Sequence, residues 1–98
     1  MQPMSNLAEA LVCNYHAIER HGLRVREIVD AYNAGAPCEV YESYRHNRRM
    51  IVLRLWRALV GLIFTTRYNA FVTAFYCDER RLSRIIERDG YERVKETA

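Results

Sequence analysis

The chain has 98 residues, half of them hydrophobic, and a formal net charge of +3. This length fits one domain, and this hydrophobic content is typical of a globular protein and not of a disordered one. Four glycines and two prolines are too few for the frequent turns of an all-β fold. The sequence therefore predicts a single domain over residues 1–98, whose ends at 1–5 and 91–98 can fray.

The cysteines give no sign of a disulfide framework, since no CxxC spacing joins Cys13, Cys38 and Cys77. A reducing cytoplasm is the predicted compartment. The N-terminal region lacks the basic start of a signal peptide and carries Glu9 in its apolar run. The longest uncharged segments, 58–66 and 68–77, are far shorter than the about 20 residues of a membrane-spanning helix. A membrane is not an expected partner, although surface association through an amphipathic helix over 49–65 stays an alternative.

Apolar residues recur with helical spacing along the chain and predict helices. The predicted helices cover residues 6–20, 23–33, 37–47, 49–65, 67–76 and 79–89. Ser5 and Asp78 can cap the first and the last of them, and Gly90 can end the last. Two junctions stay open, because 37–66 and 67–89 can each form one continuous helix, although a break near Asn47 is the favoured interpretation of the first. The predicted fold is all-α, a compact bundle of about five helices.

The segment 49–65 is the most hydrophobic part of the chain. Its core stripe is predicted to consist of Val52, Leu55, Trp56, Leu59 and Ile63. The β-branched residues of "MIVLRLW" (50–56) leave a strand as the alternative. Together with 67–76, this segment offers more apolar surface than a thin domain covers, which predicts a homodimer.

Charge is distributed in bands along the chain. Residues 1–42 hold six acids and three arginines, residues 43–77 hold six arginines and no acid, and residues 78–98 hold six of each sign. A basic band without acids predicts an anionic partner. The alternative is that the basic band packs against the acids of the N-terminal part.

The residues predicted to contact a partner are Tyr41, Tyr44, Arg45, Arg48, Arg49, Arg54 and Arg57. Arginine binds carboxylates with two parallel hydrogen bonds, and tyrosine anchors interfaces. The leading prediction is a small non-enzymatic regulatory protein that docks on an acidic surface of a protein partner. Small size and the mixture of arginine with aromatic residues resemble those of small phage- or mobile-element-encoded regulators and inhibitors, a general likeness that rests on no motif.

Nucleic-acid binding is the alternative function, because 27–49 can form a helix-turn-helix unit. Glu39 and Glu42 oppose it, since carboxylates at the start of a recognition helix repel phosphates. Cys13 and His16 share a helix face, but no further ligand follows at the spacing of a metal site. No catalytic or cofactor motif is present either. Neither an enzyme nor a cofactor or metal is therefore expected.

Overall fold

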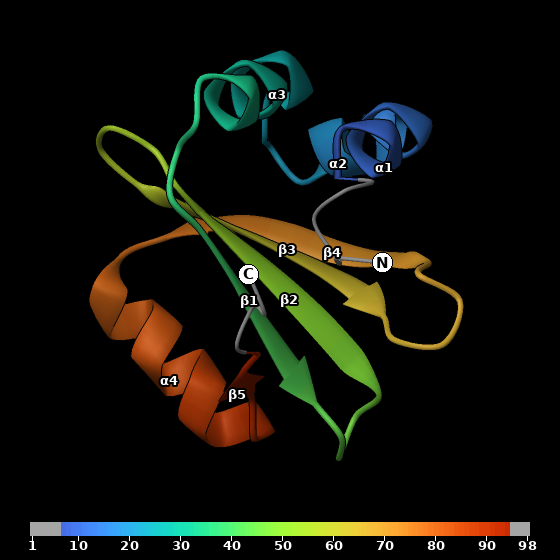
Figure 1. The fold of residues 1–98 in the computed structure, drawn as a ribbon, viewed down its shortest axis with the longest axis vertical. Helices are drawn as coiled ribbons and strands as arrows, with labels where there is room; N and C mark the ends of the chain where they lie inside the picture. The colour runs from blue at the N-terminus through green and yellow to red at the C-terminus, as the bar shows by residue number, and fades with distance from the viewer. Residues whose placement is uncertain (1–6, 95–98) are drawn as a thin grey trace.

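The computed structural model describes residues 7–94 and shows an antiparallel sheet with helices on both faces (Figure 1). Within these residues the helices are α1 (Leu7–Cys13), α2 (Tyr15–Arg20), α3 (Val25–Asn33) and α4 (Glu79–Asp89). The strands are β1 (Cys38–Ser43), β2 (Arg48–Arg54), β3 (Leu59–Thr65), β4 (Phe71–Cys77) and β5 (Glu92–Arg93). The predicted all-α bundle is therefore wrong, and the fold is mixed α/β.

The five strands lie in the order β4-β3-β2-β1-β5. The first four form a meander in which each strand pairs with the next along the chain, and β5 pairs with the outer side of β1. In the central pair, Met50 lies opposite Ile63. Asn47 and Asn69, in the turns that precede β2 and β4, both have a φ of 54°. Asparagine tolerates this left-handed conformation, and so suits the reversal of the chain.

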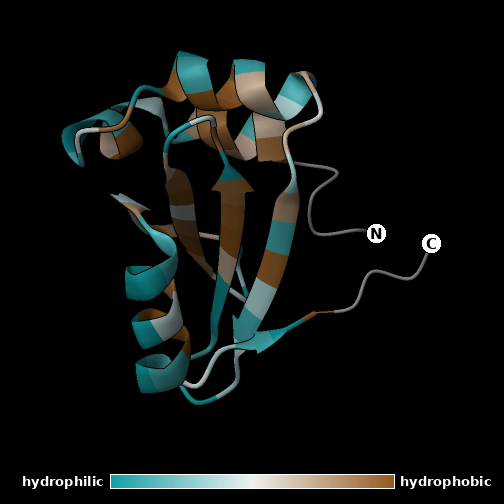
Figure 2. Ribbon diagram, turned by 90° about the vertical axis from the view of Figure 1, so that its left-hand side faces the viewer, coloured by the Kyte–Doolittle hydropathy of each residue, from teal (hydrophilic) through white to brown (hydrophobic). Residues whose placement is uncertain are grey.

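Both faces of the sheet are covered. Helices α1–α3 pack on one face and α4 packs on the other, with the apolar strands between them and a hydrophilic outer surface on α4 (Figure 2). The first core joins helix residues to alternate strand residues, among them Leu11, Ile18, Ile28, Ile51, Leu62 and Phe64. The second core contains the intervening strand residues and α4, including Met50, Val52, Ile63, Leu82 and Ile85.

Burial on both faces explains why the strands were predicted as helices. Residues 50–53 of β2 and 59–64 of β3 are all buried, so each strand is a continuous apolar run. Such a run has no period of two and cannot be told from a buried helix by periodicity. The β-branched residues of 50–56 were the correct indication. Trp56, predicted in the core, lies in the β2–β3 turn with 93% of its surface exposed.

Two predicted helices are confirmed, and one is divided. The helices expected over 23–33 and 79–89 form as α3 and α4. Of the helix expected over 6–20, the described part, 7–20, is divided into α1 and α2, and the cap predicted at Ser5 lies outside the described residues. Asp78 caps α4, accepting a hydrogen bond from the backbone N–H of Arg81 at 2.8 Å. No helix forms over 37–49, so the helix-turn-helix unit is absent. No helix within residues 7–94 combines the length and the apolar character needed to cross a membrane.

Candidate functional site

Two hairpin turns, β1–β2 and β3–β4, lie together at one end of the sheet. The backbone N–H of Thr66 donates a hydrogen bond to the carbonyl oxygen of Asn47 at 3.1 Å and ties the turns together. The end of α4 is fixed beside them, because the hydroxyl of Ser43 donates to the carbonyl oxygen of Asp89 at 2.6 Å. We call this part of the molecule the turn end, and it is formed by residues 44–48, 66–70 and 88–91.

The turn end presents tyrosines and arginines. Tyr44 in the first turn and Tyr68 in the second are each 77% exposed. Arg45 and Arg67 neighbour them in the chain, and the guanidinium of Arg67 lies 5.6 Å from the centre of the Tyr68 ring. Arg48 begins β2 and is half-buried. Among residues 7–94, no carboxylate lies within ion-pair distance of Arg45, Arg48 or Arg67.

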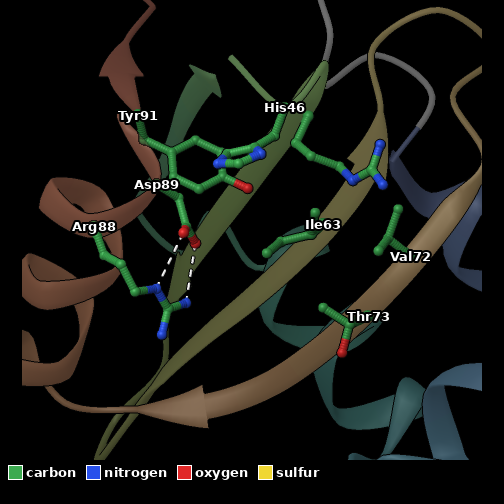
Figure 3. Close-up of a pocket in the computed structure, with 8 residues that line it drawn as sticks. His46, Ile63, Val72, Thr73, Arg88, Asp89 and Tyr91 are labelled. Atoms are coloured by element: carbon green, nitrogen blue, oxygen red, sulfur yellow. Dashed lines mark hydrogen bonds and ion pairs between the residues drawn. The ribbon is translucent and has the colours of Figure 1, made fainter. Parts of the chain in front are cut away.

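A pocket of about 330 Å³ opens at the turn end (Figure 3). Its lining combines basic, acidic, hydroxyl and apolar side chains: His46, Arg48, Arg88, Asp89, Thr73, Tyr91, Ile63 and Val72. The pocket exists because α4 ends at Asp89 and leaves the beginning of β4 open to solvent on this face. Basic groups outnumber the one acid, so the pocket suits an anion that has an aliphatic part.

The acid of the pocket is already held by its neighbour. The Nε and Nη2 atoms of Arg88 each lie 3.0 Å from a carboxylate oxygen of Asp89. This pair of hydrogen bonds lowers the pKa of Asp89 against the opposing effect of burial, and the charges of His46 and Arg45 lower it further. Asp89 thus remains ionised and neutralises Arg88. Arg48 is left as the half-buried cation without an acid partner in the described chain.

The predicted partner-binding residues do not all come together. Tyr44, Arg45 and Arg48 meet at the turn end. Arg57 lies at the opposite end of the sheet, exposed in the β2–β3 turn. Tyr41 is buried against α4, and this burial raises the pKa of its hydroxyl group.

The remaining two predicted residues are neutralised within the chain. The Nη2 atom of Arg49 lies 3.4 Å from a carboxylate oxygen of Glu42. The Nη2 atom of Arg54 lies 2.7 Å from a carboxylate oxygen of Glu39, and Nη1 of Arg54 contacts Glu79. The alternative that acids of the chain neutralise its basic band therefore holds for Arg49 and Arg54.

Several residues of the turn end were not among the predicted site residues: His46, Arg67, Tyr68, Arg88, Asp89 and Tyr91. A signal for two of them was present in the sequence. Both "YRHN" (44–47) and "RYN" (67–69) place a neighbouring tyrosine and arginine before an asparagine. That repetition indicates two similar turns, whereas nothing local indicates that α4 ends between them.

Metal ligation finds no support in the part of the chain that the structure describes, where no three His, Cys, Asp or Glu side chains gather as ligands would. Cys13, Cys38 and Cys77 form no disulfide there. Comparisons of the chain with protein-family models, with curated proteins and with solved structures gave no match. The function is therefore inferred from the turn end and its pocket.

Proposed function

We propose that this protein is a non-enzymatic binding protein whose turn end docks on an acidic surface of a protein partner. The observation that carries the proposal is the state of Arg48, which is half-buried in the pocket and has no acid partner within residues 7–94. A partly desolvated guanidinium gains most from a carboxylate that accepts two parallel hydrogen bonds. An acidic side chain of the partner supplies that carboxylate.

The lining of the pocket favours a glutamate or aspartate side chain as the occupant. Ile63 and Val72 offer apolar surface to the aliphatic part of the side chain (Figure 3). Arg48 also lines the pocket and supplies the cation for its carboxylate. Burial raises the pKa of Tyr91, so its hydroxyl remains a neutral hydrogen-bond donor beside the anion. A backbone phosphate of a nucleic acid has no aliphatic part to place on Ile63 and Val72.

The exposed residues around the pocket complete the interface. Tyr44 and Tyr68 are large, rigid side chains of the kind that dominates binding energy at protein interfaces. Arg45 and Arg67 lie at the rim, where charges mainly steer association and select the partner. Binding of this kind regulates the partner by occupying its surface.

A pair of charge-matched variants tests the proposal. Arg45→Ala with Arg48→Ala removes two cations from the turn end, and Arg57→Ala with Arg84→Ala removes two exposed cations elsewhere. The probe is a short fluorescent glutamate-rich peptide, followed by anisotropy. A hydrogen bond to a charged group contributes about 1.5–3 kcal/mol, so the first variant should weaken binding about ten- to a hundredfold. Equal loss in both variants would show a general effect of net charge and contradict the proposal.

Nucleic-acid binding is the second candidate, and the exposure of the two tyrosines favours it. Tyr44 and Tyr68 can stack on unpaired bases while Arg45 and Arg67 hold the backbone. Affinity for single-stranded DNA should then fall steeply with added salt, and Tyr44→Ala with Tyr68→Ala should abolish it. The absence of a gel shift with duplex DNA, single-stranded DNA and RNA at low salt would eliminate this candidate. Capture from the native host with and without nuclease treatment separates it from the first.

A further inference from the structure

The two edges of the sheet differ in how well they are protected from pairing with another strand. The outer side of β1 is covered by β5, a strand of two residues, Glu92 and Arg93, both of them charged. At the other edge, no segment within residues 7–94 pairs with the outer side of β4. Short strands and charged side chains are common means by which natural proteins prevent pairing at an edge. They are present at the β5 edge and missing at the β4 edge.

Strand β4 is suited to pairing. Its sequence, FVTAFYC, has no charged residue and no proline. A bulge makes Val72 the extra residue near the start of the strand, and pairing with β3 is regular over 73–77. This regular stretch of five residues is about 17 Å long at about 3.4 Å per residue. A second extended strand can therefore continue the sheet along this edge.

We infer that β4 pairs antiparallel with β4 of a second copy of this chain, with Phe75 at the twofold axis. In this register Phe75 lies opposite Phe75 of the second copy, and Thr73 lies opposite Cys77 of the second copy. Phe75 and Tyr76 are half-buried on opposite faces of the sheet. The paired strand covers both aromatic side chains and supplies partners for the outward-facing backbone groups.

Charge favours a second copy as the occupant of this edge. Two copies of a chain with net charge +3 repel each other least where the facing segments carry no net charge. Strand β4 itself has no charged residue, although the guanidinium of Arg81 lies 5.6 Å from the centre of the Phe75 ring. The charges that act on Cys77 come from Arg81, Asp78 and Glu79, which carry both signs. A strand ladder this short gives a small interface, so the dimer should be weak and dependent on concentration.

The inferred dimer does not rest on the proposed function, but it would place two turn ends in one assembly. Because the paired strands run in opposite directions, the two turn ends lie at opposite ends of one continuous sheet. An assembly with two acid-binding ends gains avidity for a partner that presents its acidic surface repeatedly. The dimer and the acidic partner are tested by separate measurements, sedimentation of the protein alone and anisotropy of the glutamate-rich peptide.

Charge exchange at the proposed axis tests the inference. The wild-type protein should show a monomer–dimer equilibrium in sedimentation velocity over a series of concentrations. Phe75→Lys and Phe75→Glu should each weaken the dimer at least about tenfold, since like charges then lie opposite each other, and an equimolar mixture of the two should restore it. A wild-type protein that stays monomeric at every concentration, or a mixture no more dimeric than either variant, would overturn the inference.

A cysteine variant tests the register while keeping the Phe75 side chain. Under oxidation, Thr73→Cys should form a disulfide-linked dimer with Cys77 of the second copy, since residues directly opposite on antiparallel strands approach closely enough for a disulfide. Thr73→Cys with Cys77→Ser should lose the cross-link, although the exposed Cys13 is retained. A cross-link that persists in the double variant, or one that forms in neither variant, would contradict this register.

Discussion

Replacing Ser43 by alanine should destabilise the fold through one lost hydrogen bond. Ser43 has an exposed fraction of 0%, and its hydroxyl donates to the carbonyl oxygen of Asp89 at 2.6 Å. That carbonyl belongs to the last turn of α4, where carbonyl groups have no partner within the helix. In Ser43→Ala the carbonyl oxygen lies against a methyl group and has lost its donor.

The size of the effect follows from burial. A typical hydrogen bond contributes about 0.5–1.5 kcal/mol net, and an acceptor left without a donor costs about 1–3 kcal/mol where it is fully buried. Ser43 is buried and Asp89 is half-buried, so the lower part of that range applies. Removing a single oxygen leaves little empty volume, so the unpaired carbonyl decides the magnitude. We expect the free energy of unfolding to fall by about 1–2 kcal/mol, which lowers Tm by about 5–15 °C in a domain of this length.

Urea unfolding followed by circular dichroism measures this effect, and Ser83→Ala is the matched control. Ser83 loses the same atom from an exposed position in α4 and should change stability by no more than about 0.5 kcal/mol. The slope of unfolding free energy against urea should stay unchanged in both variants. Equal midpoints for Ser43→Ala and Ser83→Ala would show that the buried hydroxyl does not hold the end of α4.

Three further predictions concern other parts of the molecule. Arg88 lowers the pKa of Asp89 in the folded protein. The stability that Asp89 provides is therefore complete above its unfolded pKa of about 3.9 and is lost as the pH falls through the lower folded pKa. The difference in unfolding free energy between wild type and Asp89→Asn should shrink over that pH range. Trp56→Ala should change the free energy of unfolding by less than about 0.5 kcal/mol, and acrylamide should quench Trp56 emission in the folded protein, since its side chain is exposed. Gly61→Ala should lower the free energy of unfolding by about 1–3 kcal/mol, because a Cβ there would lie 2.5 Å from the Phe75 ring. In a double-mutant cycle, the same substitution should cost much less when Phe75 is already replaced by alanine.

The helices could be predicted where their signals are local. Asp78 and Gly90 bound α4 through a cap and a left-handed residue, and Leu82 and Ile85 supply its apolar stripe. The strands could not be predicted from periodicity, because helices on both faces make 50–53 and the corresponding part of β3 continuously apolar. That coverage is a property of the whole fold, and no window of the sequence contains it.

The site could be predicted only where its residues are neighbours in the chain. Tyr44, Arg45 and Arg48 lie in one short segment and stay together at the turn end. Arg49 is adjacent to Arg48, yet in a strand it points to the opposite face and meets Glu42. Successive side chains of β2 point to opposite faces of the sheet, so Arg48 and Arg49 are separated. Helix α4 adds Arg88 to the turn end from a distant part of the chain.

The meander has a consequence for the kinetics of folding. Every pairing from β1 to β4 closes a short loop, which has a low entropic cost and favours fast folding. Contact between β5 and β1 spans more than half of the chain, so we expect this strand to join last and to open first. Amide hydrogens of 92–94 should then exchange with solvent faster than those of the central strands β2 and β3. Such opening would release the pocket residues next to β5 while the rest of the sheet stays folded.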